Sequence, residues 1–502
     1  MKRSSLGKNP YFSEAKANPT TLKRKFASNL ILLLSLNFLV KPFWIFGIDR
    51  TIQNTVGAND YGLYFALFNL SLLLNITLDF GLTNFNNREI SRHNQLLPRF
   101  LPNLIAIKLI LALFYIVTSL GLAFSFGYSG KALWLLMVLA FNQILASLIL
   151  YLRSNISGLQ LFRTDSVMSV IDRMLMIAIC STLLWTNITS QTFKIEWLAY
   201  SQTLAYFITA AAASAVIVMK VKTVKLHFDI NFSRSIIKQS YPYAMLVLLM
   251  SVYYRTDSIM IERMLPNGAV EAGIYAQAFR ILDAFTMVPF LFAGLLLPMF
   301  SGMIKRREEL IPLISFASKT LIVPIVAIAV TSYMYRYQIM NTLYHVHSFE
   351  SAQVLGLMMI TLVFSSVNYI YGTLLTANGS IGLLNKISMV GVVINLGLNF
   401  LLIPHLNALG AAISATVTQA SIALLQVIMS VRTFNLGASR KTLLRLVIFA
   451  AGSIVLAIAT YKLPLGWVTL YIVSVAVIIA LGIALRLIGL KEFWLLLKSP
   501  AE

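Results

Sequence analysis

The sequence predicts an all-α integral membrane protein with 14 transmembrane helices, arranged as two parallel six-helix repeats plus two extra helices. Three observations favour this fold class. First, 58% of the 502 residues are hydrophobic and 12% are charged, whereas a soluble domain carries about 25% charged residues. Second, polar breaks divide the chain into long apolar windows, and third, one short motif occurs twice. Together these observations exclude a soluble globular protein.

Fourteen apolar windows are long enough to cross a membrane, since a spanning helix needs about 20 apolar residues. The windows are 27–48, 61–84, 101–124, 131–153, 166–187, 196–220, 241–263, 272–300, 313–334, 352–376, 380–403, 408–432, 440–462 and 465–489. The remaining pieces are short, which leaves no room for a soluble domain. We therefore expect a cytoplasmic basic tail (1–26), an N-lobe of helices 1 to 6 (27–220), a cytoplasmic linker (221–240), a C-lobe of helices 7 to 12 (241–432), and helices 13 and 14 with a short C-terminal tail (433–502).

The formal net charge of +22 would indicate a nucleic-acid partner only if the basic residues gathered on a soluble face. They lie instead in short loops between apolar windows, so no nucleic-acid partner is expected. With the amino terminus inside, most loop Lys and Arg residues fall on inner segments, because positive charge is retained on the cytoplasmic side. The outer segments hold only Arg50, Lys131, Lys194, Arg263, Arg336 and Lys462. We therefore expect a multi-pass protein with both termini cytoplasmic.

An internal repeat divides the chain into halves. Residues 57–64 read GANDYGLY and residues 268–275 read GAVEAGIY, so the pattern G-A-x-[DE]-x-G-[LI]-Y occurs in two outer loops, before helices 2 and 8. An offset of six helices preserves orientation, which predicts parallel repeats about an axis normal to the membrane. The alternative is chance similarity between two turn-forming loops, where Gly and acidic residues are common.

Two further stretches, LDFGL at 78–82 and REISR at 88–92, follow the first motif. With the repeated loops and the six, six and two helices, they resemble the polysaccharide and oligosaccharide (O-antigen type) flippases of the multidrug/oligosaccharidyl-lipid/polysaccharide exporter superfamily. Lipid II flippases and drug/cation antiporters belong to the same superfamily. The resemblance implies two lobes around a central cavity that alternate between inward and outward states. It also implies a bacterial inner (plasma) membrane location and flipping of a polyprenyl-diphosphate-linked oligosaccharide to the outer leaflet, for polysaccharide or lipopolysaccharide biosynthesis.

Charged residues inside the windows are the candidate site, because a charge in hydrocarbon is costly unless it faces a cavity or a partner. Lys41, Arg255 and Arg280 lie at one depth, about 10–12 Å from the outer ends of helices 1, 7 and 8. In the resembled fold these helices line the cavity, so the three cations are expected to bind the diphosphate, and Arg173 to receive it in the inward state. The alternatives are that Arg280 pairs with Asp283 and that Lys41 snorkels to the interface.

Three carboxylates are candidates for coupling transport to H+ or Na+. Asp257 lies about 200° around its helix from Arg255, so the two cannot share a face. Asp283 follows Arg280 by three residues. Asp79 lies near the inner end of helix 2, where capping or a loop contact is the alternative role.

No cofactor and no metal are expected. The sequence has no G-x-x-x-x-G-K-[ST] phosphate-binding motif, and its single cysteine, Cys180, lies inside an apolar window. Membrane lipids and a lipid-linked oligosaccharide are the expected partners. Two other functions stay open: a drug/cation antiporter of the same superfamily, and a polymerase or ligase of lipid-linked sugars. The enzyme is disfavoured because the longest outer loop, 335–351, barely exceeds an ordinary connector.

Overall fold

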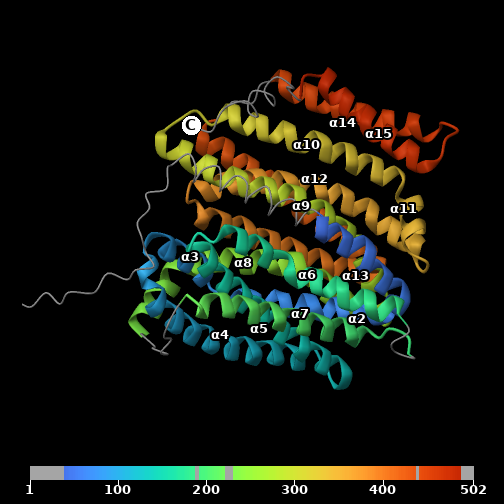
Figure 1. The fold of residues 1–502 in the computed structure, drawn as a ribbon. Coiled ribbons are helices and arrows are strands. Elements are labelled where there is room, and N and C mark those ends of the chain that lie inside the picture. Colours follow the sequence, from blue (N-terminus) through green and yellow to red (C-terminus); the bar gives the residue numbers. More distant parts are fainter. Residues whose placement is uncertain (1–38, 187–190, 221–229, 437–439, 488–502) are drawn as a thin grey trace, which may run out of the picture.

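The computed structural model describes residues 39–186, 191–220, 230–436 and 440–487. Within these ranges every regular element is a helix, and the long helices run alongside one another (Figure 1). The expected tail (1–26), the first half of the expected linker (221–229) and residues 488–502 lie outside the described residues.

The helices up to α7 are called the N-lobe here, and α8 to α13 the C-lobe. The N-lobe contains η1 (Trp44–Asp49), α2 (Arg50–Leu73), η2 (Asn75–Leu78), α3 (Leu82–Arg92), η3 (Asn94–Leu96), α4 (Leu97–Ser125), α5 (Gly130–Gly158), α6 (Phe162–Trp185) and α7 (Ile195–Val218). The C-lobe contains α8 (Ile230–Met264), α9 (Gly268–Arg306), α10 (Ile311–Met334), α11 (Arg336–Leu343), α12 (Ser348–Ala377) and α13 (Ile381–Phe434). Two further helices, α14 (Arg440–Tyr461) and α15 (Trp467–Ala484), pack against α10 at one edge of the molecule, and α4 lies at the opposite edge (Figure 1).

Eleven of the described helices are long and apolar enough to cross a membrane. They include every expected window after the second, and two of these windows share α13. This helix is not one straight rod, because Asn407 leaves helical geometry with φ 52° and ψ −136°. A Cβ atom built on Gly410 would lie 2.5 Å from the carbonyl oxygen of Leu402, whereas eight residues of straight helix span about 12 Å. The chain therefore turns back at Asn407, as two spans require. The total of fourteen stays a prediction.

The second expected window, 61–84, is interrupted. α2 ends at Leu73, and the chain unwinds at Phe80 and Gly81, whose φ angles are 43° and 81°. Unwound backbone at membrane depth is stable only where protein or water satisfies its polar groups. Here the ammonium group of Lys108 does so, since its Nζ atom lies 3.2 Å from the carbonyl oxygen of Leu78.

The same ammonium group pairs with Asp79, with 2.8 Å between Nζ and Oδ1, and donates to the Ser147 hydroxyl at 2.9 Å. Lys108 lies eleven residues after Leu97, or about 16 Å into α4. Asp79 lies beyond the end of α2 at Leu73, and its place near the inner membrane face stays a prediction. The sequence analysis ended the second window at residue 84, whereas α3 continues it to Arg92.

The two copies of the repeated motif meet each other where α2 packs against α9. A Cβ atom on Gly62 would lie 1.8 Å from the carbonyl oxygen of Ala269, and a Cβ atom on Gly273 would lie 2.2 Å from that of Ala58. In both contacts the sixth motif residue, a glycine, of one copy lies against the second motif residue, an alanine, of the other copy. Such reciprocity is typical of a two-fold contact, and it supports the prediction of duplicated lobes. We call this contact the glycine seam.

Gly62→Ala is expected to separate the lobes at the ends predicted to face outward, because a methyl group cannot fit against the Ala269 carbonyl. The probe is disulfide formation between Asn54→Cys and His345→Cys in a Cys180→Ala background, since the backbone nitrogen of His345 lies 3.3 Å from the Asn54 side-chain oxygen. Overpacking costs about 1–3 kcal/mol, so the disulfide yield should fall on the order of tenfold. The control is Gly121→Ala, which has open space around it. Equal yields in the two variants would contradict the seam.

Lys108→Met is expected to destabilise the N-lobe, because it removes the cationic partner of the Asp79 carboxylate and one of the two donors to the Leu78 carbonyl oxygen, the other being the Ser147 hydroxyl. Removing one partner of a buried ion pair costs about 3–5 kcal/mol, measured as a lower unfolding temperature in detergent. Lys131→Met is the control, since the Lys131 side chain is 95% exposed. Adding Asp79→Asn to Lys108→Met should restore part of the loss. Equal unfolding temperatures for the two Lys→Met variants would show that the pair contributes little.

Candidate functional site

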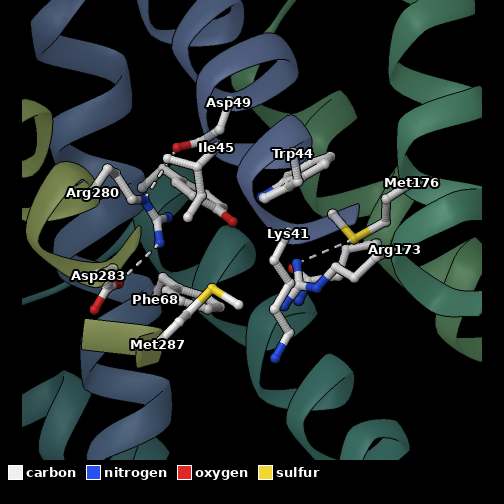
Figure 2. Close-up of a pocket in the computed structure, with 12 residues that line it drawn as sticks. Lys41, Trp44, Ile45, Asp49, Phe68, Arg173, Met176, Arg280, Asp283 and Met287 are labelled. Carbon is white, nitrogen blue, oxygen red and sulfur yellow. Dashed lines mark hydrogen bonds and ion pairs between the residues drawn. The ribbon is translucent and has the colours of Figure 1, made fainter. Parts of the chain in front are cut away.

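A pocket of about 210 Å³ lies between the lobes (Figure 2). We call it the inter-lobe pocket. Its walls come from the helical residues before η1, from η1, α2, α6 and α7 of the N-lobe, and from α9 of the C-lobe. The lining residues are Lys41, Trp44, Ile45, Asp49, Tyr64, Phe68, Arg173, Met176, Gln202, Arg280, Asp283 and Met287. The pocket therefore contains three of the four basic residues that the sequence analysis selected for the substrate.

Lys41 and Arg173 form the basic wall on the N-lobe side (Figure 2). The guanidinium carbon of Arg173 lies 5.8 Å from the ring centre of Trp44, and its NH1 atom lies 3.7 Å from the Met176 sulfur. Among the described residues, no carboxylate oxygen lies within 4.0 Å of either cation. Neither cation therefore has a close ion-pair partner in that part of the chain, and both line the pocket, with Asp172 acting on them only at longer range.

Arg280 faces them from α9. Its Nε atom lies 3.2 Å from an oxygen of Asp49 and donates to the Tyr61 hydroxyl at 3.0 Å. Its NH1 atom lies 3.8 Å from Asp283 (Figure 2), so the pairing considered as an alternative is present as a long contact. Phe65 also lies beside the guanidinium group, with its ring centre 5.2 Å from the guanidinium carbon. Arg280 is thus held by both lobes at once.

Asp49 is a site residue that the sequence analysis missed. Its carboxylate is 1% exposed and accepts hydrogen bonds from the Tyr61 hydroxyl, at 2.9 Å, and from the Gln53 amide, at 3.2 Å. It lies one residue beyond the first expected window, 27–48, so it was not among the charged residues selected inside the windows. The available signal was Gln53 four residues later, which places a second polar group on the same helix face.

Arg255 was expected beside Lys41 and Arg280, but it does not line the inter-lobe pocket. Its NH1 atom donates to the side-chain oxygen of Asn69 at 3.0 Å, which connects α8 to α2. Equal depth along three helices did not determine the direction in which each side chain points. The structure thus groups Lys41, Arg173 and Arg280, and leaves Arg255 at the contact between the lobes.

Asp257 lies within the C-lobe and is 2% exposed. Its carboxylate accepts hydrogen bonds from Tyr275 at 2.8 Å, from Asn395 at 2.9 Å and from Asn399 at 2.7 Å. The side-chain oxygen of Asn399 is buried and has no hydrogen-bond partner among the described residues. Asp257 and Arg255 face different neighbours, in keeping with their predicted angular separation. Of the other two acidic candidates, Asp283 lines the inter-lobe pocket.

Asp79, the third acidic candidate, lies outside the inter-lobe pocket. Besides its pair with Lys108, it accepts a hydrogen bond from the backbone nitrogen of Thr83 at 3.3 Å, near the start of α3. This is the capping role that the sequence analysis considered as its alternative. Both contacts lie within the N-lobe and hold the interruption between α2 and α3 together.

Further contacts join the lobes at the helix ends predicted to face outward. The side chains of Arg50 and Asn54 both donate to the carbonyl oxygen of Leu343, at 2.8 and 2.9 Å. Elsewhere on this side, Arg263 donates to the carbonyl oxygen of Phe126 at 3.0 Å. In addition, the Tyr128 hydroxyl donates to Glu262 at 2.6 Å. With the glycine seam, these contacts close the lobes together beyond one end of the inter-lobe pocket.

The fold is similar to that of several solved flippase and transporter structures, at low sequence identity. The lipid II flippase MurJ in an inward closed conformation is 14% identical, with a TM-score of 0.67 over 91% of this chain and 98% of that chain. A multidrug resistance MATE family transporter of the MOP superfamily in an inward-facing conformation is 15% identical, with a TM-score of 0.63 over 81% and 98%. A MOP superfamily transporter from Pyrococcus furiosus is 16% identical, with a TM-score of 0.55 over 84% and 96%.

Comparison of the sequence with known proteins gives one match, to a protein family. No curated protein matches the chain. One protein family, described as polysaccharide biosynthesis protein, matches residues 26–304, which is more than half of the chain and includes the glycine seam, Arg173 and Arg280. The chain therefore belongs to the polysaccharide biosynthesis protein family.

Proposed function

We propose that this protein flips a polyprenyl-diphosphate-linked oligosaccharide from the inner to the outer leaflet of the bacterial inner membrane by alternating access. One observation carries the proposal: Lys41, Arg173 and Arg280, from two lobes, line one pocket between them. Buried cations in a membrane protein mark a substrate path by default. A diphosphate supplies the matching anion, because arginine can bind two of its oxygens at once and lysine adds a point charge.

The closed outer side supports an inward-facing state for this conformation. The pocket residues Tyr64 and Arg280 follow Gly62 and Gly273 along α2 and α9, so the glycine seam lies on the outer side of the pocket under the predicted orientation. The two neighbours with the highest TM-scores reported above are also described as inward closed and inward-facing. In this state a lipid-linked diphosphate would enter from the cytoplasmic leaflet, and transport would require the seam to open.

A drug or cation antiporter is the second candidate. Asp49 and Asp283, together with the rings of Trp44, Tyr64 and Phe68, also line the pocket, and carboxylates with aromatic rings suit an organic cation. The Pyrococcus furiosus transporter is described as having a binding pocket of reverse polarity that suggests a different function. Pocket polarity is therefore the feature that separates the two candidates. Here three basic residues face two acidic ones, which favours an anionic substrate.

The two candidates are separated by reconstituting the full chain in liposomes and measuring flipping of a fluorescent lipid-linked sugar alongside drug efflux. We expect flipping, and we expect Arg173→Ala and Arg280→Ala each to reduce its rate at least on the order of tenfold, since one charge-assisted contact contributes about 1.5–3 kcal/mol. Arg432→Ala is the matched control, because Arg432 is exposed at the end of α13, outside the pocket lining. Drug efflux without flipping, or normal flipping by both pocket variants, would refute the proposal.

We further propose that Asp257, Asn395 and Asn399 hold a coupling cation, either H+ or Na+. The support is a buried carboxylate with three neutral hydrogen-bond donors, next to an amide oxygen of Asn399 that has no partner among the described residues. Oxygen ligands of this kind suit a hard cation, and protonation of the carboxylate would equally neutralise it.

Asp257→Asn is expected to abolish the response of flipping to an imposed Na+ or H+ gradient, because the variant can neither bind a cation by charge nor accept a proton. The rate is compared with and without each gradient in the liposome assay. Asp165→Asn is the control, because Asp165 is a partly exposed carboxylate of the N-lobe that pairs with Arg153 at 2.8 Å and lies outside the proposed cation site. If wild-type flipping ignores both gradients, or if Asp257→Asn responds like wild type, Asp257 is not the coupling site.

A further inference from the structure

We propose that Asp49 occupies the place of the substrate's phosphate on Arg280 while the pocket is empty, and that substrate binding breaks this ion pair and loosens the glycine seam. Asp49 is thereby a positioning residue that couples substrate arrival to opening of the outer side. The inference rests on the proposed function, because it assumes that an anionic group enters the inter-lobe pocket.

The charges in the inter-lobe pocket are the first support for this exchange. The pocket is lined by Lys41, Arg173 and Arg280 against Asp49 and Asp283, so one positive charge is left over. A diphosphate that links a polyprenol to a sugar carries about two negative charges, which one surplus positive charge cannot balance in a membrane interior. With the substrate bound, negative charge exceeds positive charge in the pocket, so the phosphate oxygens compete with the carboxylates for the cations, and any exchange must occur at a cation that already has a carboxylate partner. Arg280 is the only one of the three cations that has such a partner among the described residues.

Of the two carboxylates beside Arg280, Asp49 is the one whose ion pair the substrate breaks. Asp283 lies on the same helix as Arg280, at 3.8 Å, so separating these two groups changes no contact between the lobes. Asp49 lies in the N-lobe at 3.2 Å from Arg280, and this ion pair crosses the interface. When the Arg280 guanidinium group binds a phosphate in place of Asp49, the Asp49 carboxylate keeps its hydrogen bonds from Tyr61 and Gln53. Its carboxylate is therefore not left without partners, and the exchange is physically possible.

The Asp49–Arg280 ion pair lies next to the glycine seam in both helices. Tyr61, which bonds both Asp49 and Arg280, immediately precedes Gly62 in the chain. On the opposite side, Arg280 lies seven residues after Gly273 on α9, or about 10 Å along the helix. The ion pair thus stabilises the closed seam from the pocket side. Breaking it removes the charged contact between the lobes that lies nearest to the substrate.

Binding of inorganic pyrophosphate to the full-length protein in nanodiscs tests the exchange. Asp49→Asn removes the competing charge, so we expect it to bind pyrophosphate about tenfold more tightly than wild type, whereas a merely structural role would weaken binding. The matched control is Asp165→Asn, which should bind as wild type does. Equal or weaker binding by a folded Asp49→Asn variant would overturn the inference while leaving the cationic pocket intact. If neither wild type nor Asp49→Asn binds pyrophosphate, the proposed anion site itself fails.

A second measurement does not depend on the folding of Asp49→Asn. With the Asn54→Cys and His345→Cys pair in the Cys180→Ala background and Asp49 unchanged, pyrophosphate should lower the rate of disulfide formation across the outer side at least threefold. Inorganic sulfate at equal ionic strength is the control for general salt effects. A rate that pyrophosphate does not change, in protein shown to bind it, would overturn the link between the ion pair and the seam.

Discussion

Backbone contact at the glycine seam is the constraint on which the rest of the structure depends. Gly62 and Gly273 let α2 and α9 approach until each helix touches a carbonyl oxygen of the other. That approach brings the C-lobe residue Arg280 within reach of Asp49 in the N-lobe. The inter-lobe pocket lies on one side of this contact. The hydrogen bonds that Arg50 and Arg263 make to the other lobe lie on the opposite side. Without two residues lacking side chains at these positions, the lobes would stand further apart and the pocket would lose one wall.

The ionisable residues inside the helix bundle differ in the groups that neutralise or surround them. The Lys108 ammonium neutralises Asp79 and satisfies unwound backbone in the same place, so an interrupted helix is tolerated inside the membrane. Asp257 has three neutral donors and no basic neighbour among its hydrogen-bond partners, which sets it apart from a structural ion pair. Lys41 and Arg173 differ again, because their charges face the pocket. These three situations underlie one structural role, holding the fold, and two proposed ones, binding a small cation and receiving an anion.

The positions of most helices could be predicted from the sequence, because a membrane helix is recognised by the length and hydrophobicity of its segment. The windows after the second, the turn between the two halves of α13 and the repeated motif all agree with the helices observed. What the sequence could not supply is direction around each helix. Arg255 has the predicted depth but points to Asn69, and Asp49 was overlooked because its partner Arg280 is remote in the chain. Lys108 was missed for the same reason, since its partners come from separate segments.

Two carboxylates in a pocket for an anion are at first sight a disadvantage, yet an alternating-access cycle supplies a reason for them. A carrier that has released its substrate must return empty, and three uncompensated cations in a low-dielectric cavity would repel one another at that stage. With Asp49 and Asp283 present, the empty pocket holds one surplus charge instead of three. Under the proposed exchange, the same carboxylates would lower substrate affinity by competing for Arg280, which would favour release on the outer side. Moderate affinity in both directions suits a transporter better than tight binding, because a substrate held too strongly in the pocket cannot leave it.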